Sequence, residues 1–153
     1  MSVVIEGFRA KHALAFDKLN REWLVTYGLL EAADEPHLRD PQAHILDKGG
    51  AIFVALEGED VLGTSAIVPA HDGVFELVKL AVSPSSRGRG IGRRFAQECI
   101  EAARKFGARK LVLLSASRLQ AAVHLYERLG FRHEPLPSSN PYATADVYMV
   151  LDL

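Results

Sequence analysis

The segment from Arg87 to Gly92 reads Arg-Gly-Arg-Gly-Ile-Gly and leads directly into an amphipathic helical pattern. Glycines allow the backbone to turn tightly and to approach a ligand closely. The first N–H groups of a helix are unpaired, and the helix dipole places partial positive charge at that end. The segment therefore predicts an anion site suited to a phosphate or a pyrophosphate. An ordinary basic turn exposed to solvent is the alternative.

The spacing of the glycines distinguishes between kinds of phosphate site. In the dinucleotide-binding pattern Gly-x-Gly-x-x-Gly the last glycine would fall on Arg93 or on Phe95, so that pattern is absent. The Gly-Lys-Ser/Thr sequence of a nucleoside triphosphate loop is absent as well. The pattern that fits is Arg-x-x-Gly-x-Gly, formed by Arg87, Gly90 and Gly92.

Two other side chains could transfer protons. Tyr126 lies on the apolar face of a helical pattern, so packing in the core is its alternative role. Period-two alternation places Glu76 on one strand face with Val78, Leu80 and Val82. Burial among apolar side chains raises the pKa of a carboxyl group toward the range useful for a general base. An ion pair at the edge of the strand is the alternative for Glu76.

The single cysteine and the six histidines give no sign of other chemistry. Cys99 lies on the apolar stripe of the helical pattern 91–106, which predicts a buried, inert thiol rather than a nucleophile. The histidines form no His-Glu-x-x-His motif and no cluster with the cysteine, so we expect no metal site.

Hydrophobic periodicity predicts the elements that position these residues. The loop Gly58–Asp60 joins two strand-like runs and predicts a hairpin. Hairpins followed by strand–helix alternation imply a mixed sheet with helices on its faces. The expected strands are 3–9, 51–57, 61–68, 74–82, 111–115, 131–134 and 145–153, and the expected helices are 11–27, a short one within 28–47, 91–106 and 119–129.

Length and composition indicate one globular domain, 1–153. The chain has 153 residues, of which 48% are hydrophobic and 24% charged. No apolar run reaches the roughly 18 residues of a membrane span, and the first residues do not resemble a signal peptide. With one cysteine, a cytoplasmic protein without a membrane partner is the expectation.

Charge is distributed unevenly along the chain. Residues 1–60 carry 11 Asp/Glu and 6 Lys/Arg, whereas residues 85–110 carry 8 Lys/Arg and 2 Asp/Glu. The basic segment could bind nucleic acid, but the overall pI is about 6.6. Its two aromatic residues, Phe95 and Phe106, are expected on the apolar stripe rather than on a surface that stacks with bases. We therefore expect no nucleic-acid partner.

Four features follow one another in the chain: the strand ELVKLAV (76–82), the loop RGRGIG (87–92) with its helix, the strand LVLLS (111–115) and AAVHLYERLGF (121–131). Taken in this order, they resemble the GNAT superfamily of N-acetyltransferases. The resemblance implies an α/β (α+β) fold with a mixed, mostly antiparallel central sheet, helices on both faces and a splay between the two central parallel strands, 74–82 and 111–115. It also implies acetyl-CoA as the acyl donor, a co-substrate that enters the splay.

The same resemblance implies the residues of the acetyl-CoA site. The pyrophosphate would lie on the loop, the pantetheine arm beside the preceding strand, and the oxyanion on a backbone N–H near residues 80–82. Many family members have an asparagine where this chain has Leu119, so Ser115 or Ser117 could supply that contact instead. The expected donor-binding residues are Leu80, Ala81, Val82, Arg87, Gly88, Arg89, Gly90, Ile91, Gly92, Arg93, Ser115 and Tyr126.

The resemblance further implies catalytic roles in acetyl transfer to a primary amine of a small molecule or peptide, within a ternary complex. Tyr126 occupies the family's position for the general acid that protonates the thiolate, and a phenol stays protonated at neutral pH. Glu76 would be the general base, directly or through water. A catalytically silent acyl-CoA-binding regulatory domain is the alternative.

The acceptor would be held by the first helix and the acidic segment after it. Trp23 and Tyr27 could attract a cationic amine, and Glu76 would lie beside it; a core tryptophan beside a solvated acidic loop is the alternative. The strand 145–153 is apolar on both faces, and an exposed edge strand of that kind tends to pair. We therefore expect a homodimer.

Overall fold

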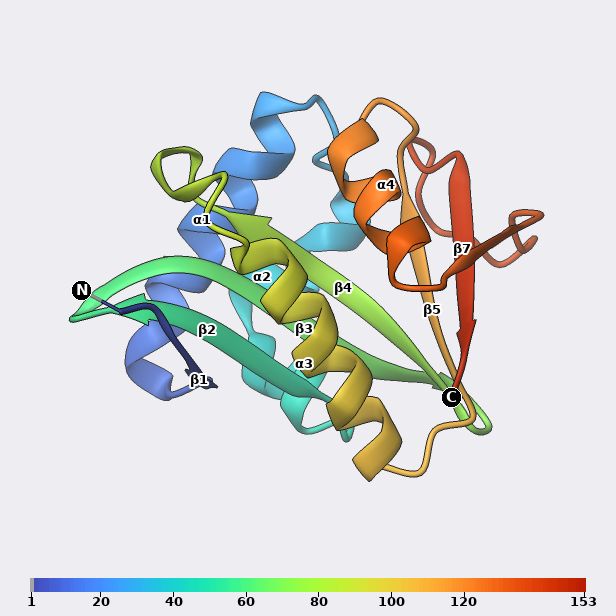
Figure 1. Ribbon diagram of the computed structural model, residues 1–153, viewed down its shortest axis with the longest axis horizontal. Helices are drawn as coiled ribbons and strands as arrows, with labels where there is room; N and C mark the ends of the chain where they lie inside the picture. Colours follow the sequence, from blue (N-terminus) through green and yellow to red (C-terminus); the bar gives the residue numbers. More distant parts are fainter. Residues whose placement is uncertain (1) are drawn as a thin grey trace.

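The structure, a computed structural model, describes residues 2–153 and contains one sheet of seven strands (Figure 1). Its spatial order is β1-β2-β3-β4-β5-β7-β6. The strands are β1 (Val4–Gly7), β2 (Ala51–Glu57), β3 (Asp60–His71), β4 (Val74–Val82), β5 (Lys110–Ser115), β6 (Arg132–Glu134) and β7 (Val147–Asp152), and the α-helices are α1 (Ala13–Thr26), α2 (Glu35–Arg39), α3 (Ile91–Lys105) and α4 (Gln120–Arg128).

The expected order of elements along the chain is confirmed. Several boundaries differ by one or two residues. The largest difference is in β3, which starts at Asp60, so the hairpin loop is shorter, and which continues to His71. None of the helices in residues 2–153 combines the length and the apolar character that crossing a bilayer requires.

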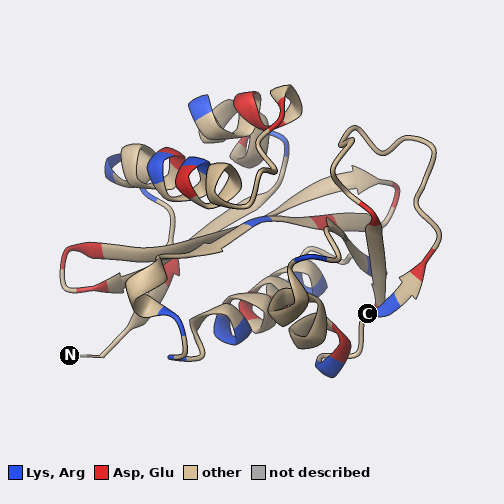
Figure 2. Ribbon diagram, turned by 90° about the horizontal axis from the view of Figure 1, so that it is seen from above, with Lys and Arg blue, Asp and Glu red and all other residues tan. Residues whose placement is uncertain are grey.

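Helices cover both faces of the sheet (Figure 2). On one face, Phe16 of α1 and Leu38 of α2 pack in a cluster with Ile52 and Ala66 of the sheet. On the other face, α3 and α4 cover the second cluster, to which α3 contributes Cys99 and Ala103. These helices form because their apolar residues recur with helical spacing and gain stability by burial against the sheet.

The stripe expected on α3 is correct except at its end. Phe106 is 51% exposed and stacks on Phe75 with ring centroids 5.5 Å apart. It follows Lys105, the last residue of α3, and Gly107 with φ +79° ends the helical geometry directly after it, so the buried stripe does not extend to Phe106.

The sheet splays between β4 and β5, as the resemblance implies. These two strands run parallel and pair only from Val74–Lys110 to Glu76–Val112. Beyond that point β4 continues to Val82 and β5 to Ser115 without pairing with each other, and Figure 1 shows the two strands diverging. The other five strand pairs of the sheet are antiparallel.

A β-bulge in β4 lies beside the splay. Thr64 of β3 pairs with Ala81, but two residues later Ala66 pairs with Val78, so β4 has one extra residue here. Within the bulge Lys79 has φ +54°, the only positive φ of a non-glycine residue among residues 2–153. A side chain in this left-handed region costs about 1–2 kcal/mol, so other contacts must hold it there.

The bulge makes one sequence interpretation wrong. Val78 packs in the cluster beneath α1 and α2, whereas Leu80 and Val82 pack in the cluster beneath α3. Glu76 therefore does not share a face with Leu80 and Val82, because the extra residue interrupts the period-two alternation.

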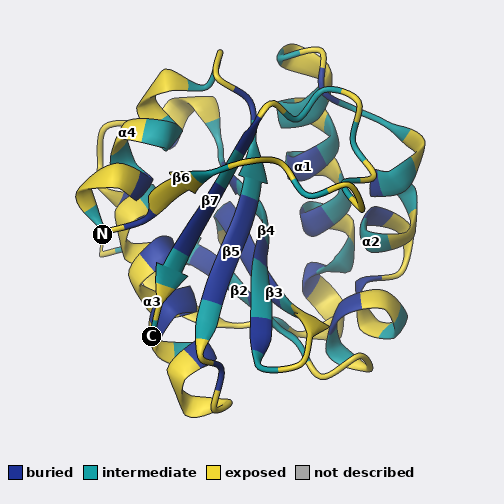
Figure 3. Ribbon diagram, turned by 90° about the vertical axis from the view of Figure 1, so that its right-hand side faces the viewer, coloured by how far each residue is buried: buried dark blue, intermediate teal, exposed yellow. Residues whose placement is uncertain are grey.

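The homodimer is expected on the basis that the C-terminal strand lies at the edge of the sheet. In the structure this strand, β7, is internal. β7 pairs with β5 on one side, from Lys110–Asp152 to Ser115–Val147, and with β6 on the other. Figure 3 shows β7 between these neighbours, with the segment 135–146 passing from β6 toward α1 and α2. Its two apolar faces are explained by an internal position, since Val147 and Met149 pack under α3 and α4 while Val150 packs with Val74 and Val112 on the other face.

Candidate active site

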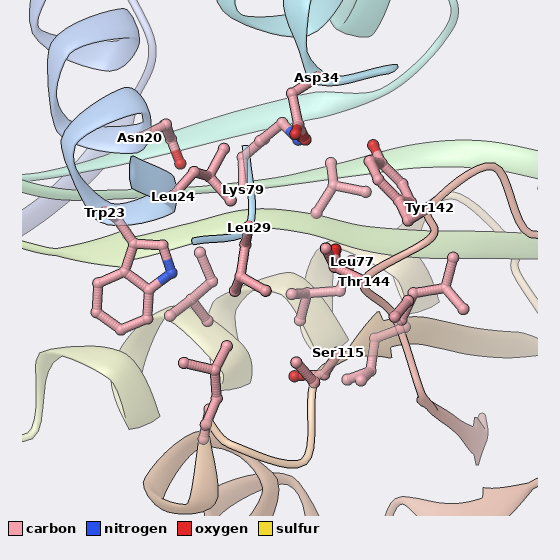
Figure 4. Close-up of a pocket in the computed structure, with 18 of the residues that line it drawn as sticks. Asn20, Trp23, Leu24, Leu29, Asp34, Leu77, Lys79, Ser115, Tyr142 and Thr144 are labelled. Carbon is pink, nitrogen blue, oxygen red and sulfur yellow. The ribbon is translucent and has the colours of Figure 1, made fainter. Parts of the chain in front are cut away.

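A cavity of about 170 Å³ lies in the splay between β4 and β5 (Figure 4). Residues from α1, β4, β5, α4 and the segment 135–146 line it. Both candidate proton-transfer residues, Glu76 and Tyr126, lie on its wall. The wall also includes Leu80 and Ser115, which the sequence placed in the donor site.

The glycine-arginine loop has the conformation that an anion site requires. Gly88 and Gly90 have φ of +79° and +74°, and Gly90 is the N-cap of α3. No side chain caps this helix, and a Cβ atom added at either glycine would meet no atom within 4 Å. The start of α3 is therefore open to a ligand that accepts hydrogen bonds from backbone N–H groups.

The arginines of the loop differ in their contacts. Arg89 donates to Glu57 at 2.7 Å, which ties the loop to β2. The guanidinium of Arg87 lies 5.1 Å from the centroid of the Trp23 ring and 5.7 Å from that of Tyr27. Arg93 is exposed on the first turn of α3. The loop thus carries positive charge beside the end of α1.

The position of Tyr126 is compatible with both roles that the sequence left open, packing and proton transfer. It is 6% exposed and packs edge-on against Phe131, with ring centroids 5.7 Å apart, while also lining the cavity. Burial raises the pKa of its phenol above the usual value near 10. The side chain therefore keeps its proton over the whole physiological pH range and can donate it into the cavity.

Glu76 lies where β4 and β5 stop pairing. Burial raises the pKa of its carboxyl group, and the positive charge of Lys79 partly opposes that shift. A carboxylate with a raised pKa is a better proton acceptor at neutral pH than an exposed one. Glu76 is partly buried rather than exposed, and it takes part in none of the ion pairs within residues 2–153, so an exposed ion pair at the strand edge does not describe this residue.

The polar floor of the cavity contains an ion pair that the sequence did not predict. Lys79 and Asp34 are buried, with side chains 6% and 3% exposed, and they form an ion pair at 2.5 Å. The Lys79 ammonium also lies 5.6 Å from the centroid of the Tyr142 ring, and Figure 4 shows these three side chains together. Burial, followed by the nearby negative charges of Asp34 and Glu76, raises the pKa of Tyr142. Lys79 lies 45 positions after Asp34, and Tyr142 lies 63 positions after Lys79, so no local pattern could associate them.

The acidic segment after α1 bonds within the chain. Glu31 accepts hydrogen bonds from the N–H groups of Ala143 and Thr144, both at 2.9 Å, and so fastens the segment 135–146 over the cavity. Glu35 forms ion pairs with Arg21 and Arg39 at 2.8 and 2.9 Å. The acidity that the sequence offered to a cationic acceptor is thus largely neutralised internally.

The remaining expected residues separate into those on the cavity wall and those beside it. Trp23, Ser115 and Leu119 line the cavity, whereas Ser117 binds Asp146 through its N–H and its hydroxyl, at 2.7 and 2.6 Å. Ser115 therefore remains the better placed of the two serines. Tyr27 is not on the wall; it packs on Trp23 with ring centroids 4.7 Å apart.

Cys99 is fully buried, and burial raises the pKa of its thiol to about 12, which confirms an inert side chain. Among residues 2–153, no group of three or more His, Cys, Asp or Glu side chains is arranged to hold a metal ion.

Parallel strands that splay beside a glycine loop at a helix start are the arrangement that the resemblance to acetyl-CoA-dependent acyltransferases implied. A model of the acetyltransferase (GNAT) family matches residues 15–131. The chain belongs to this family.

Comparison with known proteins agrees with this assignment. The uncharacterized N-acetyltransferase YjgM of Escherichia coli is 29% identical over 126 residues, which cover 78% of this chain and 75% of YjgM. An uncharacterized N-acetyltransferase of Schizosaccharomyces pombe is 30% identical over 149 residues, covering 90% of this chain and 86% of that protein. N-acetyltransferase 8 of Rattus norvegicus is 30% identical over 96 residues, which cover 60% of this chain but 43% of the rat protein.

Solved structures show the same fold. A GNAT-family acetyltransferase from Staphylococcus aureus has a TM-score of 0.90 at 18% identity, with 99% of each chain covered. The acetyltransferase yncA of Salmonella typhimurium, solved with acetyl-CoA, has a TM-score of 0.78 at 18% identity, covering 100% of this chain and 95% of yncA.

Proposed function

We propose that this protein is an N-acetyltransferase that moves an acetyl group from acetyl-CoA to a primary amine of a small molecule or a peptide. The observation that carries the proposal is that Glu76 and Tyr126 line one cavity in the splay. Family membership supports acetyl-CoA as the donor.

The donor would extend from the loop at the start of α3 into the splay. Backbone N–H groups of residues 87–92 would receive the pyrophosphate. Beyond Glu76, the edge of β4 that faces β5 has no strand partner, so its backbone groups can bond to the pantetheine arm. Ser115, on the opposite wall, would replace the asparagine found in many relatives.

The reaction joins the amine nitrogen to the thioester carbonyl carbon and breaks the C–S bond of acetyl-CoA. Glu76, directly or through water, accepts the proton that the amine must lose, because an alkyl ammonium with a pKa near ~10 cannot attack. A backbone N–H of residues 80–82 stabilises the oxyanion of the tetrahedral intermediate. Tyr126 then donates its proton to the departing thiolate and regains one from solvent.

Trp23 would contact the body of the acceptor, since it lies on the cavity wall. The Arg87 guanidinium already lies 5.1 Å from the centroid of the Trp23 ring, so attraction between Trp23 and a cationic acceptor has a competitor within the chain. Tyr27 would act through Trp23 by supporting its ring.

A panel of primary amines, with thiol release from acetyl-CoA as the readout, tests this function. We expect turnover with at least one amine. Binding of acetyl-CoA without turnover on any amine would instead favour the regulatory domain. The homodimer stays a prediction without its edge-strand argument, and light scattering at micromolar concentration tests it.

A further inference from the structure

A chain of hydrogen bonds through two buried side chains, Asn20 and Thr64, supports the bulge of β4 from the side of α1. The side-chain amide of Asn20 donates to the hydroxyl of Thr64 at 2.9 Å, and that hydroxyl donates to the backbone carbonyl of Lys79 at 3.1 Å. Asn20 is also fixed on α1, because its amide donates to the carbonyl of Phe16 at 2.9 Å. Asn20 and Thr64 are 2% and 0% exposed, so water cannot replace these bonds in the folded protein.

The bulge needs this support because the sheet does not provide it. The register gives Lys79 no partner in β3, and β4 is unpaired with β5 beyond Glu76. The φ of Lys79 is +54°, a conformation that its side chain disfavours. The Thr64 hydroxyl holds the carbonyl of this residue, and Asp34 holds its ammonium. Thr64 thus holds the backbone of Lys79, and Asp34 holds the end of its side chain.

The position of this backbone matters for the reaction. The oxyanion donor of the proposed mechanism is a backbone N–H of residues 80–82, which follow Lys79 directly. Any rotation at Lys79 displaces these N–H groups relative to the thioester carbonyl. A displacement of about 1 Å in a catalytic group can cost about 100-fold in rate.

We propose that Thr64, supported by Asn20, is a positioning residue for acetyl transfer. Its hydroxyl fixes the bulge and thereby aims the oxyanion donor of β4 at the carbonyl of acetyl-CoA. This inference rests on the proposed function, because it assumes acetyl-CoA in the splay. It predicts an effect on the reacting carbonyl that is separate from binding of the CoA pyrophosphate.

The test replaces Thr64 with valine, which has the same shape but no hydroxyl. We expect kcat with the best amine to fall about 10- to 100-fold, while the Kd for CoA, measured by calorimetry, changes less than about twofold. Thr64→Ser keeps the hydroxyl and should retain kcat within about twofold of the wild type. Ser65→Ala is the matched control, because it removes the neighbouring buried hydroxyl. That hydroxyl accepts a hydrogen bond from Cys99 on the α3 side of the sheet, so Ser65→Ala should retain kcat as well.

A second readout does not require an acceptor. Infrared spectra of bound acetyl-CoA, labelled with ¹³C at the thioester carbonyl, report how strongly the oxyanion donor polarises that group. In the wild type, Thr64→Ser and Ser65→Ala we expect the carbonyl band to shift below that of free acetyl-CoA. In Thr64→Val the band should return toward the free position.

Several outcomes would overturn the inference. A folded Thr64→Val protein with wild-type kcat and a wild-type carbonyl band would do so, and so would an equal loss in Ser65→Ala. If Thr64→Val does not fold, Asn20→Ala decides in its place by the same two readouts. Wild-type protein that binds acetyl-CoA but acetylates no amine would refute the proposed function alone, because the carbonyl band still tests the role of Thr64.

Discussion

Replacing Tyr126 with phenylalanine tests the assignment of the general acid most directly. The substitution removes one hydroxyl from the cavity wall and keeps the ring, which packs edge-on against Phe131 at 5.7 Å. Losing a general acid typically lowers kcat by about 10²–10⁴-fold, which corresponds to about 3–5 kcal/mol of transition-state stabilisation. Because the apolar contacts remain, the melting temperature should stay within about 3 °C of the wild type.

The assay measures thiol release at saturating acetyl-CoA and amine, with the Kd for CoA measured separately. We expect kcat to fall by at least about 100-fold and the Kd to change little, since the hydroxyl is not part of the pyrophosphate loop. Burial raises the pKa of the wild-type phenol, so the wild-type rate should not decline below pH ~10 through ionisation of Tyr126. A folded Tyr126→Phe enzyme with wild-type kcat would refute the assignment and leave Tyr126 as a packing residue.

Three further substitutions probe the base, the loop and the buried ion pair. Burial raises the pKa of Glu76, so wild-type kcat/KM should fall as pH drops through that raised value, because the protonated carboxyl cannot act as a base. In Glu76→Gln the loss relative to the wild type should be largest above that pKa, while the acceptor amine is still mostly protonated, and partly rescued at high pH, where more amine is neutral. Gly90→Val and Gly107→Val both place a side chain at a positive φ, +74° and +79°, with no atom within 4 Å of the new Cβ. Both variants should therefore lose about 1–2 kcal/mol of stability. Calorimetry should show weaker CoA binding, by about tenfold or more, for Gly90→Val only. Lys79→Met leaves the buried carboxylate of Asp34 without its cation. The free energy of unfolding should fall by about 3 kcal/mol, and thermal denaturation should show a melting temperature lower by about 6–12 °C. An unchanged melting temperature would show that the pair contributes little.

The sequence by itself determined the elements and their order. Apolar residues repeat with period 3.6 in α3 and α4 and form short apolar runs in β4 and β5, and these local patterns depend only on neighbours along the chain. The glycine loop was found for the same reason, because its turn, its charge and the start of α3 lie within ten residues. Tyr126 and Glu76 were found through motifs that are likewise continuous in sequence.

The tertiary structure decided what depends on distant partners. The apolar pattern of β7 shows that both faces are buried but not which strands flank it, so an internal strand was interpreted as an edge. The extra residue in β4 has no sequence signature, because it is defined only by the register against β3. The ion pair of Lys79 with Asp34 joins residues 45 positions apart and forms only when α2 packs on the sheet. These long-range contacts, rather than any local pattern, shape the floor of the cavity and the backbone that faces the thioester.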